Sequence, residues 1–129
     1  MKEVLAVIRP NKFGIIKNAL SDAGFPAFSC RKVMGRGKKY MDTSIFEAAV
    51  IQEELSTVPA AEYLESTSRL MPKRLLTMVV QDADVKTIVD VIIEHTSEGN
   101  PGDGKIFILP ISESIRIRDG EFQNDSESY

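Results

Sequence analysis

Apolar positions repeat along the chain in two ways, and each way predicts a different element. Mainly apolar runs at 3–9, 25–35, 74–80 and 105–109 predict strands, because buried strands are short and rich in aliphatic residues. A last short strand is expected at 115–118. Between these runs, apolar side chains recur at helical spacing at Phe13, Ile16, Ala19, Leu20 and Ala23, and again at Val85, Ile88, Val89 and Ile92.

Polar, proline and glycine residues mark where these elements begin and end. Pro10 ends the first strand because it has no N–H group for a ladder, and Asn11 can cap the helix that follows. Gly24 ends that helix. Asp82 or Asp84 can cap the second helix, and capping explains these carboxylates better than acid–base chemistry does.

The order of the elements, β-α-β and then β-α-β, predicts the ferredoxin-like plan. In this α+β fold, βαββαβ, an antiparallel sheet carries both helices on one face. Residues 36–72 separate the two halves, and loops longer than ~12–15 residues are usually functional or disordered. We therefore expect one domain at 1–121, a long flexible loop between its second and third strands, and a disordered acidic tail at 122–129.

Composition narrows the class of protein further. The 129 residues suffice for one domain with a single core. A net charge of -3 argues against a general nucleic-acid binder. No apolar run reaches the ~20 residues of a membrane span, and the single cysteine, Cys30, excludes an internal disulfide. We expect a cytoplasmic protein with no nucleic-acid partner and no membrane insertion.

A glycine turn, Gly102-Asp103-Gly104-Lys105, stands just before the last long strand. Glycines let backbone N–H groups approach an anion closely, and Lys105 adds a positive charge. The turn is not a Walker A loop, because no helix follows and the glycine spacing differs. Taken alone, Gly-Asp-Gly is more often a plain turn than an anion site.

Arg116 and Arg118 favour the anion site. In a strand at 115–118 they would project from one face, while the isoleucines beside them turn inward. Two parallel guanidiniums can hold phosphate groups through bidentate bonds, although a solvated edge strand explains them equally well. Further basic residues lie at the stems of the long loop, at 35–39 and 72–74. A polyanionic small ligand fits this pattern better than a nucleic acid.

With these motifs the chain resembles the PII nitrogen-regulatory family. The resemblance covers residues 1–38 and 71–121, in order and with the family's spacing, and it fails across the long loop and the tail. Its most specific segments are 102–107 and 115–121. The other matching segments are Ala6-Val7-Ile8-Arg9-Pro10, Val33-Met34-Gly35-Arg36-Gly37 and Met71-Pro72-Lys73.

The resemblance implies a trimer that binds ATP or ADP in each cleft between neighbouring subunits. It also implies that 2-oxoglutarate binds beside ATP through a shared magnesium ion. The implied nucleotide-binding residues are Val7, Ser29, Gly35 and Val79 for the adenine, Gly37, Lys38, Gly102, Gly104, Lys105, Arg116 and Arg118 for the phosphates, and Asp103 with no part of the nucleotide assigned to it. The implied 2-oxoglutarate residues are Lys39, Lys73 and Gly102.

Two features depart from the family's pattern. Lys38 and Lys39 stand where many members have Arg-Gln, and a charged lysine cannot offer magnesium the oxygen of that glutamine. Either the register differs by a residue or effector binding is altered, and no residue is assigned as a metal ligand. The loop is also longer than usual, and the modified-tyrosine motif is not recognisable around Tyr40 or Tyr63.

Ser44-Ile45-Phe46-Glu47 has the form of a capping box and predicts a short amphipathic helix in the loop. That helix would either dock on a partner or pack on its own trimer. The enlarged loop resembles the nitrogenase-associated branch of the family. The resemblance implies a nitrogen and energy-status regulator, a homotrimer or a mixed oligomer with a sister PII protein. Such regulators inhibit dinitrogenase until ATP and 2-oxoglutarate release them. An ammonium transporter or glutamine synthetase is the alternative target.

We expect no enzyme, because no nucleophile and base can be assembled from these residues. His95 is the only histidine and lacks a ligand cluster, and Cys30 has no nearby base. Two other classes stay open. A small ferredoxin-like phosphohydrolase would need a positioned nucleophile. A structural trimer of the copper-tolerance type would leave the basic motifs unexplained.

Overall fold

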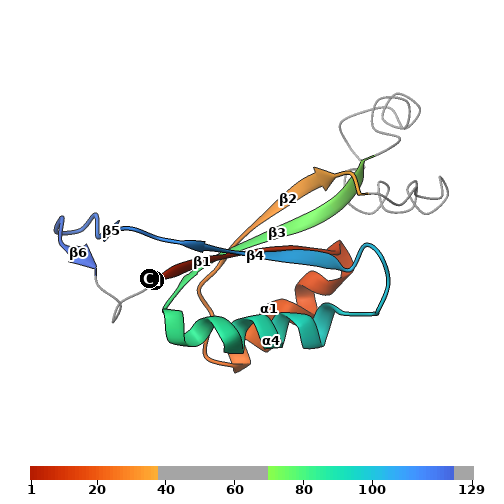
Figure 1. Ribbon diagram of the computed structural model, residues 1–129, viewed down its shortest axis with the longest axis horizontal. Coiled ribbons are helices and arrows are strands. Elements are labelled where there is room, and N and C mark those ends of the chain that lie inside the picture. Colours follow the sequence, from red (N-terminus) through yellow and green to blue (C-terminus); the bar gives the residue numbers. More distant parts are fainter. Residues whose placement is uncertain (38–69, 124–129) are drawn as a thin grey trace.

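The computed structural model describes residues 1–37 and 70–123 (Figure 1). The predicted order of strands and helices is confirmed, although β2 is shorter than expected and β3 is longer. The elements are β1 (Lys2–Ile8), η1 (Pro10–Lys12), α1 (Phe13–Asp22), β2 (Ser29–Gly35), β3 (Met71–Val80), η2 (Asp82–Asp84), α4 (Val85–Thr96), β4 (Gly104–Pro110), β5 (Ser114–Ile115) and β6 (Phe122–Gln123).

Four strands form one antiparallel sheet in the order β2-β3-β1-β4. Both helices cover the same face of this sheet and contact each other, so the ferredoxin-like prediction is confirmed (Figure 1). The predicted long loop falls mostly on residues 38–69, outside the described residues. Its far boundary was placed too late, because Met71 and Pro72 already pair with β2 as part of β3. No helix in the described part of the chain is long and apolar enough to cross a membrane.

The hydrophobic core lies between the sheet and the two helices. Alternate residues of β1 and β3 point toward the helices and are buried, as expected for a sheet covered on one face. Side chains from both helices close the core from the other side. The buried apolar residues are Val4, Ala6, Ile8, Leu76, Met78 and Val80 from the sheet, with Ile16, Leu20, Ile88 and Ile92 from the helices.

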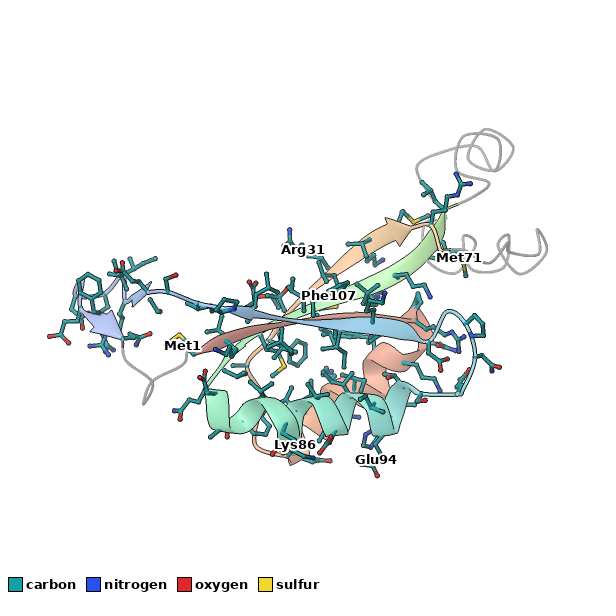
Figure 2. All side chains as sticks on the ribbon, viewed as in Figure 1. Met1, Arg31, Met71, Lys86, Glu94 and Phe107 are labelled. Carbon is teal, nitrogen blue, oxygen red and sulfur yellow. The ribbon has the colours of Figure 1, made fainter. Side chains whose placement is uncertain are left out.

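The opposite face of the sheet carries no helix in the described residues. Leu5 pairs with Thr77 on one side and with Phe107 on the other, so these three share that face. Phe107 is 49% exposed, and Figure 2 shows it on the side away from the helices. Leu109, two residues further along β4, is also exposed. Exposed apolar side chains grouped on a bare sheet face are typical of a protein–protein contact surface.

The helices begin differently from the sequence prediction. Lys12, not Asn11, is the N-cap of α1, and it makes no side-chain cap hydrogen bond. Asp84 is the N-cap of α4 without a capping bond, while Asp82 accepts a 2.7 Å bond from the amino group of Met1. A short 3-10 turn precedes each helix and keeps the N-cap backbone in the helical region, whereas a capping side chain needs extended backbone.

The strand predicted at 115–118 is wrong beyond Ile115. β5 is short and pairs with β6, and a turn at 117–119 joins them. Ile117 is 100% exposed instead of inward-facing. The Asp119 carboxylate closes the turn by accepting bonds from Arg116 Nε at 2.8 Å and from the backbone N–H of Glu121 at 3.1 Å. Residues 124–129 lie outside the described residues, so most of the expected tail does too.

Candidate functional site

The loop between α4 and β4 approaches the end of β1 closely, and two glycines make this possible. Gly104 has φ of +128°, and a Cβ atom there would lie 2.0 Å from the carbonyl oxygen of Val7. Gly102 has φ of +99°, and its Cβ would lie 3.4 Å from Nη2 of Arg9. Any larger residue at 104 would collide with backbone, so the glycine turn has a specific shape and is more than a flexible link.

Two cations from different strands flank this loop. Lys73 Nζ on β3 donates a hydrogen bond to the carbonyl oxygen of Gly102 at 2.7 Å. Arg9, just after β1, reaches the neighbouring carbonyl of Pro101 at 3.4 Å. Burial and the positive charge of Arg9 lower the pKa of Lys73 from its ordinary value. An anion bound between these cations would relieve their mutual repulsion.

Acidic side chains hold the same loop from within. Asp103 Oδ1 lies 3.1 Å from Arg9 Nη1, and Arg9 also pairs with Glu98. Lys12 Nζ lies 2.8 Å from Oε1 of Glu98. The backbone N–H groups of residues 98–100 all donate to Asp103 Oδ2, and these bonds lower the pKa of Asp103. Side chains from both ends of the sequence therefore fix the loop.

A cleft of about 420 Å³ opens beside this loop, between α4 and the edge strand β4. Its apolar walls include Val89, Ile93 and Ile106, and its rim includes Gly104 and Lys105. Val7 also lines it and pairs with Lys105 across the sheet. Asp103 lines the cleft as well, so apolar walls from α4 and β4 meet the charged residues of the glycine turn there.

The structure separates the two basic motifs that the sequence prediction joined. Lys105 opens β4, whereas Arg116 and Arg118 follow its far end, and the seven residues of β4 span roughly 20 Å. Figure 1 shows the α4–β4 loop and the β5–β6 hairpin at opposite ends of the molecule. Arg116 pairs with Asp119 at 2.6 Å, and the Arg118 side chain is 77% exposed. One chain alone cannot bring these cations to the same phosphate groups.

The predicted adenine residues are divided in the same way. Val7 and Gly35 lie toward the loop end of the sheet. Ser29 and Val79 lie further along, where Ser29 pairs with Thr77 on the bare face. Gly37 is described and exposed, whereas the predicted ligands Lys38 and Lys39 lie outside the described residues.

Sequence reasoning gave no role to Arg9, Lys12 or Glu98, which hold the loop. The only signal was position: Arg9 and Lys12 follow the end of the first strand, where the sheet meets the loop. No group of His, Cys, Asp or Glu side chains within residues 1–37 and 70–123 could hold a metal ion.

The chain is similar to known proteins along most of its length. The family model described as "Nitrogen regulatory protein P-II" matches residues 1–121. "Nitrogen fixation nifHD region GlnB-like protein 2" of Methanothermococcus thermolithotrophicus is 41% identical over 123 residues, or 94% of each chain. The protein of that name from Methanothermobacter marburgensis is 38% identical over 94% of this chain and 95% of its own. "Nitrogen regulatory protein P-II 2" of Methanothermobacter thermautotrophicus is 36% identical over 94% of this chain and 92% of its own.

Proposed function

This chain belongs to the nitrogen regulatory protein P-II family, and from that premise we propose that it senses ATP, ADP and 2-oxoglutarate and regulates nitrogenase. Proteins of this family are signal-transduction regulators and not enzymes, which removes the phosphohydrolase alternative. The nif-region names of its relatives support a role in nitrogen signalling. The nucleotide, the effector and the target are the proposed parts.

The division of the basic motifs between two ends of the folded molecule (Figure 1) carries the nucleotide proposal. The loop of one subunit would bind phosphate groups through the glycine backbone and Lys105, while a neighbour would supply Arg116 and Arg118. The bare sheet face, with exposed Phe107, supports such a neighbour. The adenine would contact Val7 of one subunit and Ser29 and Val79 of the next. Three such contacts close a cyclic trimer.

Lys73 is the proposed partner for a carboxylate of 2-oxoglutarate. Its ammonium group lies at the loop, where burial and then the positive charge of Arg9 lower the pKa of Lys73. A carboxylate there would offset both desolvation and repulsion. The described residues offer magnesium no protein ligand cluster, so no step of the proposal passes through the metal. Lys39 would meet the effector from residues that the structure does not describe.

Calorimetry and sedimentation together test the sensing proposal. We expect a cytoplasmic trimer that binds ATP and ADP with micromolar or better affinity, and binds ATP more tightly when 2-oxoglutarate is present. A stable monomer that gives no heat with either nucleotide would overturn the proposal. A trimer that binds nucleotide but ignores 2-oxoglutarate would overturn only the effector part.

The proposed target is dinitrogenase, bound through the long connection between β2 and β3 by a homotrimer or by a mixed oligomer with a sister PII protein. Capture from nitrogen-fixing cells should recover nitrogenase subunits, and ATP with 2-oxoglutarate should release them. Recovery of an ammonium transporter or glutamine synthetase without nitrogenase would reverse this choice of target.

A further inference from the structure

Asp103 stands in the middle of the glycine turn, yet its carboxylate points back into its own loop. Oδ2 accepts hydrogen bonds from three successive backbone N–H groups, those of Glu98 and Gly99 at 2.9 Å and of Asn100 at 3.2 Å. Oδ1 lies 3.1 Å from Nη1 of Arg9, and the side chain is 21% exposed. Oδ2 is therefore held by the backbone of its own loop, whereas the buried Oδ1 forms an ion pair with Arg9 but accepts no hydrogen bond within the described residues.

Successive backbone N–H groups that converge on one point form an anion-binding nest. Here the chain's own carboxylate occupies the nest at residues 98–100, so a phosphate group cannot bind in it. The three N–H groups and Arg9 also balance the negative charge of Asp103. Without that balance, a carboxylate between Gly102 and Gly104 would repel the phosphates of a bound nucleotide.

We propose that Asp103 is a positioning residue, which touches no nucleotide but holds the 98–104 loop in the shape that binds phosphate. This inference rests on the nucleotide binding proposed above and reassigns Asp103 within it. A loop that is already ordered in the free protein binds its ligand more tightly, because binding then costs less conformational entropy. Arg9 would contribute to the same effect by joining the loop to the end of β1.

The charge state of Asp103 supports a role at neutral pH. The backbone bond from Glu98 is the largest cause of its lowered pKa. A carboxyl group with a lowered pKa stabilises the loop fully above the ordinary Asp range and loses this effect only as pH falls through the lowered value. Loop shape should therefore be constant from about pH 5 to 8.

Asp103→Asn tests the proposal because it preserves shape but removes the charge. The amide keeps one oxygen for three N–H groups and turns its NH₂ toward Arg9. We expect ATP and ADP affinity to fall at least about tenfold, AMP affinity to fall less, and hydrogen exchange at residues 98–100 to accelerate. Asp90→Asn is the matched control, since Asp90 pairs with Lys86 on the outer side of α4, away from the loop (Figure 2).

The opposite model, in which Asp103 faces the nucleotide, predicts that Asp103→Asn binds ATP as well as or better than the wild type. That result, or unchanged exchange at residues 98–100, would overturn the inference while leaving the proposed function intact. A wild-type protein that binds no nucleotide would remove both. If Asp103→Asn does not fold, Asp103→Glu keeps the charge but displaces the carboxylate from the nest, and it should show the same pattern with a smaller loss.

Discussion

The two ends of the sheet bear the same kind of cationic chemistry but are built very differently. At the loop end, Arg9 and Lys73 reach the 98–104 loop from β1 and β3, so groups distant in sequence hold one another. At the hairpin end, Arg116 pairs with its near neighbours in sequence, Asp119 and Glu121. The strands β5 and β6 contain two residues each.

The difference indicates which half of the proposed site is ready before binding. The loop is constrained on several sides and can present its glycine backbone without rearrangement. The hairpin has exposed apolar residues, among them Ile117 and Phe122. In the proposed site, Arg116 would exchange its ion pairs with Asp119 and Glu121 for contacts with phosphate. Strands of this length are marginal by themselves, so in the proposed trimer the hairpin would gain more stability from a neighbouring subunit than the loop would.

Gly104→Ala should have the largest effect, because it changes the backbone of the 98–104 loop, the half of the proposed site that is ordered before the nucleotide binds. The new Cβ would meet the Val7 carbonyl oxygen at 2.0 Å in a backbone conformation that suits glycine. We expect a loss of roughly 2–4 kcal/mol in unfolding free energy and no measurable ATP binding. Chemical denaturation and calorimetry measure these. Gly14→Ala, where a Cβ meets nothing within 4 Å, is the control and should not weaken either property.

Lys105→Ala and Arg116→Ala should each weaken ATP binding by ~1.5–3 kcal/mol, the range for a charged hydrogen bond. The two losses should be similar although the residues lie toward opposite ends of the folded subunit (Figure 1). Titration calorimetry measures both, with Lys86→Ala on the exposed side of α4 as control. Wild-type affinity in both variants would place the phosphates elsewhere.

Lys73→Met should abolish the response to 2-oxoglutarate while leaving ATP binding largely unchanged. Lys73 donates to a backbone carbonyl within its own subunit, so ATP affinity alone should change by less than about 1 kcal/mol. The increase in ATP affinity produced by 2-oxoglutarate should disappear, and by linkage the reciprocal effect should disappear too. An undiminished effector response would assign the carboxylate to another group.

Deleting residues 44–66 should have the smallest effect on nucleotide binding at the loop and hairpin ends of the sheet. These residues lie between β2 and β3, and none belongs to the proposed nucleotide contacts. ATP affinity and trimer mass should stay within error of the wild type, whereas capture of nitrogenase should be lost. Retained capture by the shortened protein would contradict the assignment of target binding to this connection.

The sequence predicted the fold well because its signals are local. The apolar runs of β1 and β3, the helical stripe of α4 and the glycine stop after α1 are all features of short stretches of sequence. The failures had a different cause. Asn11 was expected to cap α1, and Asp82 or Asp84 to cap α4. Asp84 is the N-cap of α4, but neither helix has a side-chain capping bond, because the 3-10 turns that precede the helices remove the backbone geometry that capping needs.

The sequence identified most residues of the candidate site but not how the fold arranges them. Gly102, Gly104 and Lys73 do meet at one end of the sheet. The alternation argument for Arg116 and Arg118 failed because Asp119 closes a turn inside the expected strand. Arg9 could not be assigned to the loop, because its partners lie about ninety residues away in sequence and sequence spacing does not report such contacts.

Subunit mixing tests most directly whether the two ends form one site between neighbours. Lys105→Ala and Arg116→Ala chains are unfolded, combined in equal amounts and refolded, and ATP binding is measured at a concentration where neither variant alone binds. If one chain supplies the loop and the next supplies the hairpin, each cyclic trimer that contains both chains has one cleft with both native residues, so about a quarter of all clefts in the refolded mixture recover binding. No recovery in trimers shown to contain both chains would contradict a site shared between subunits.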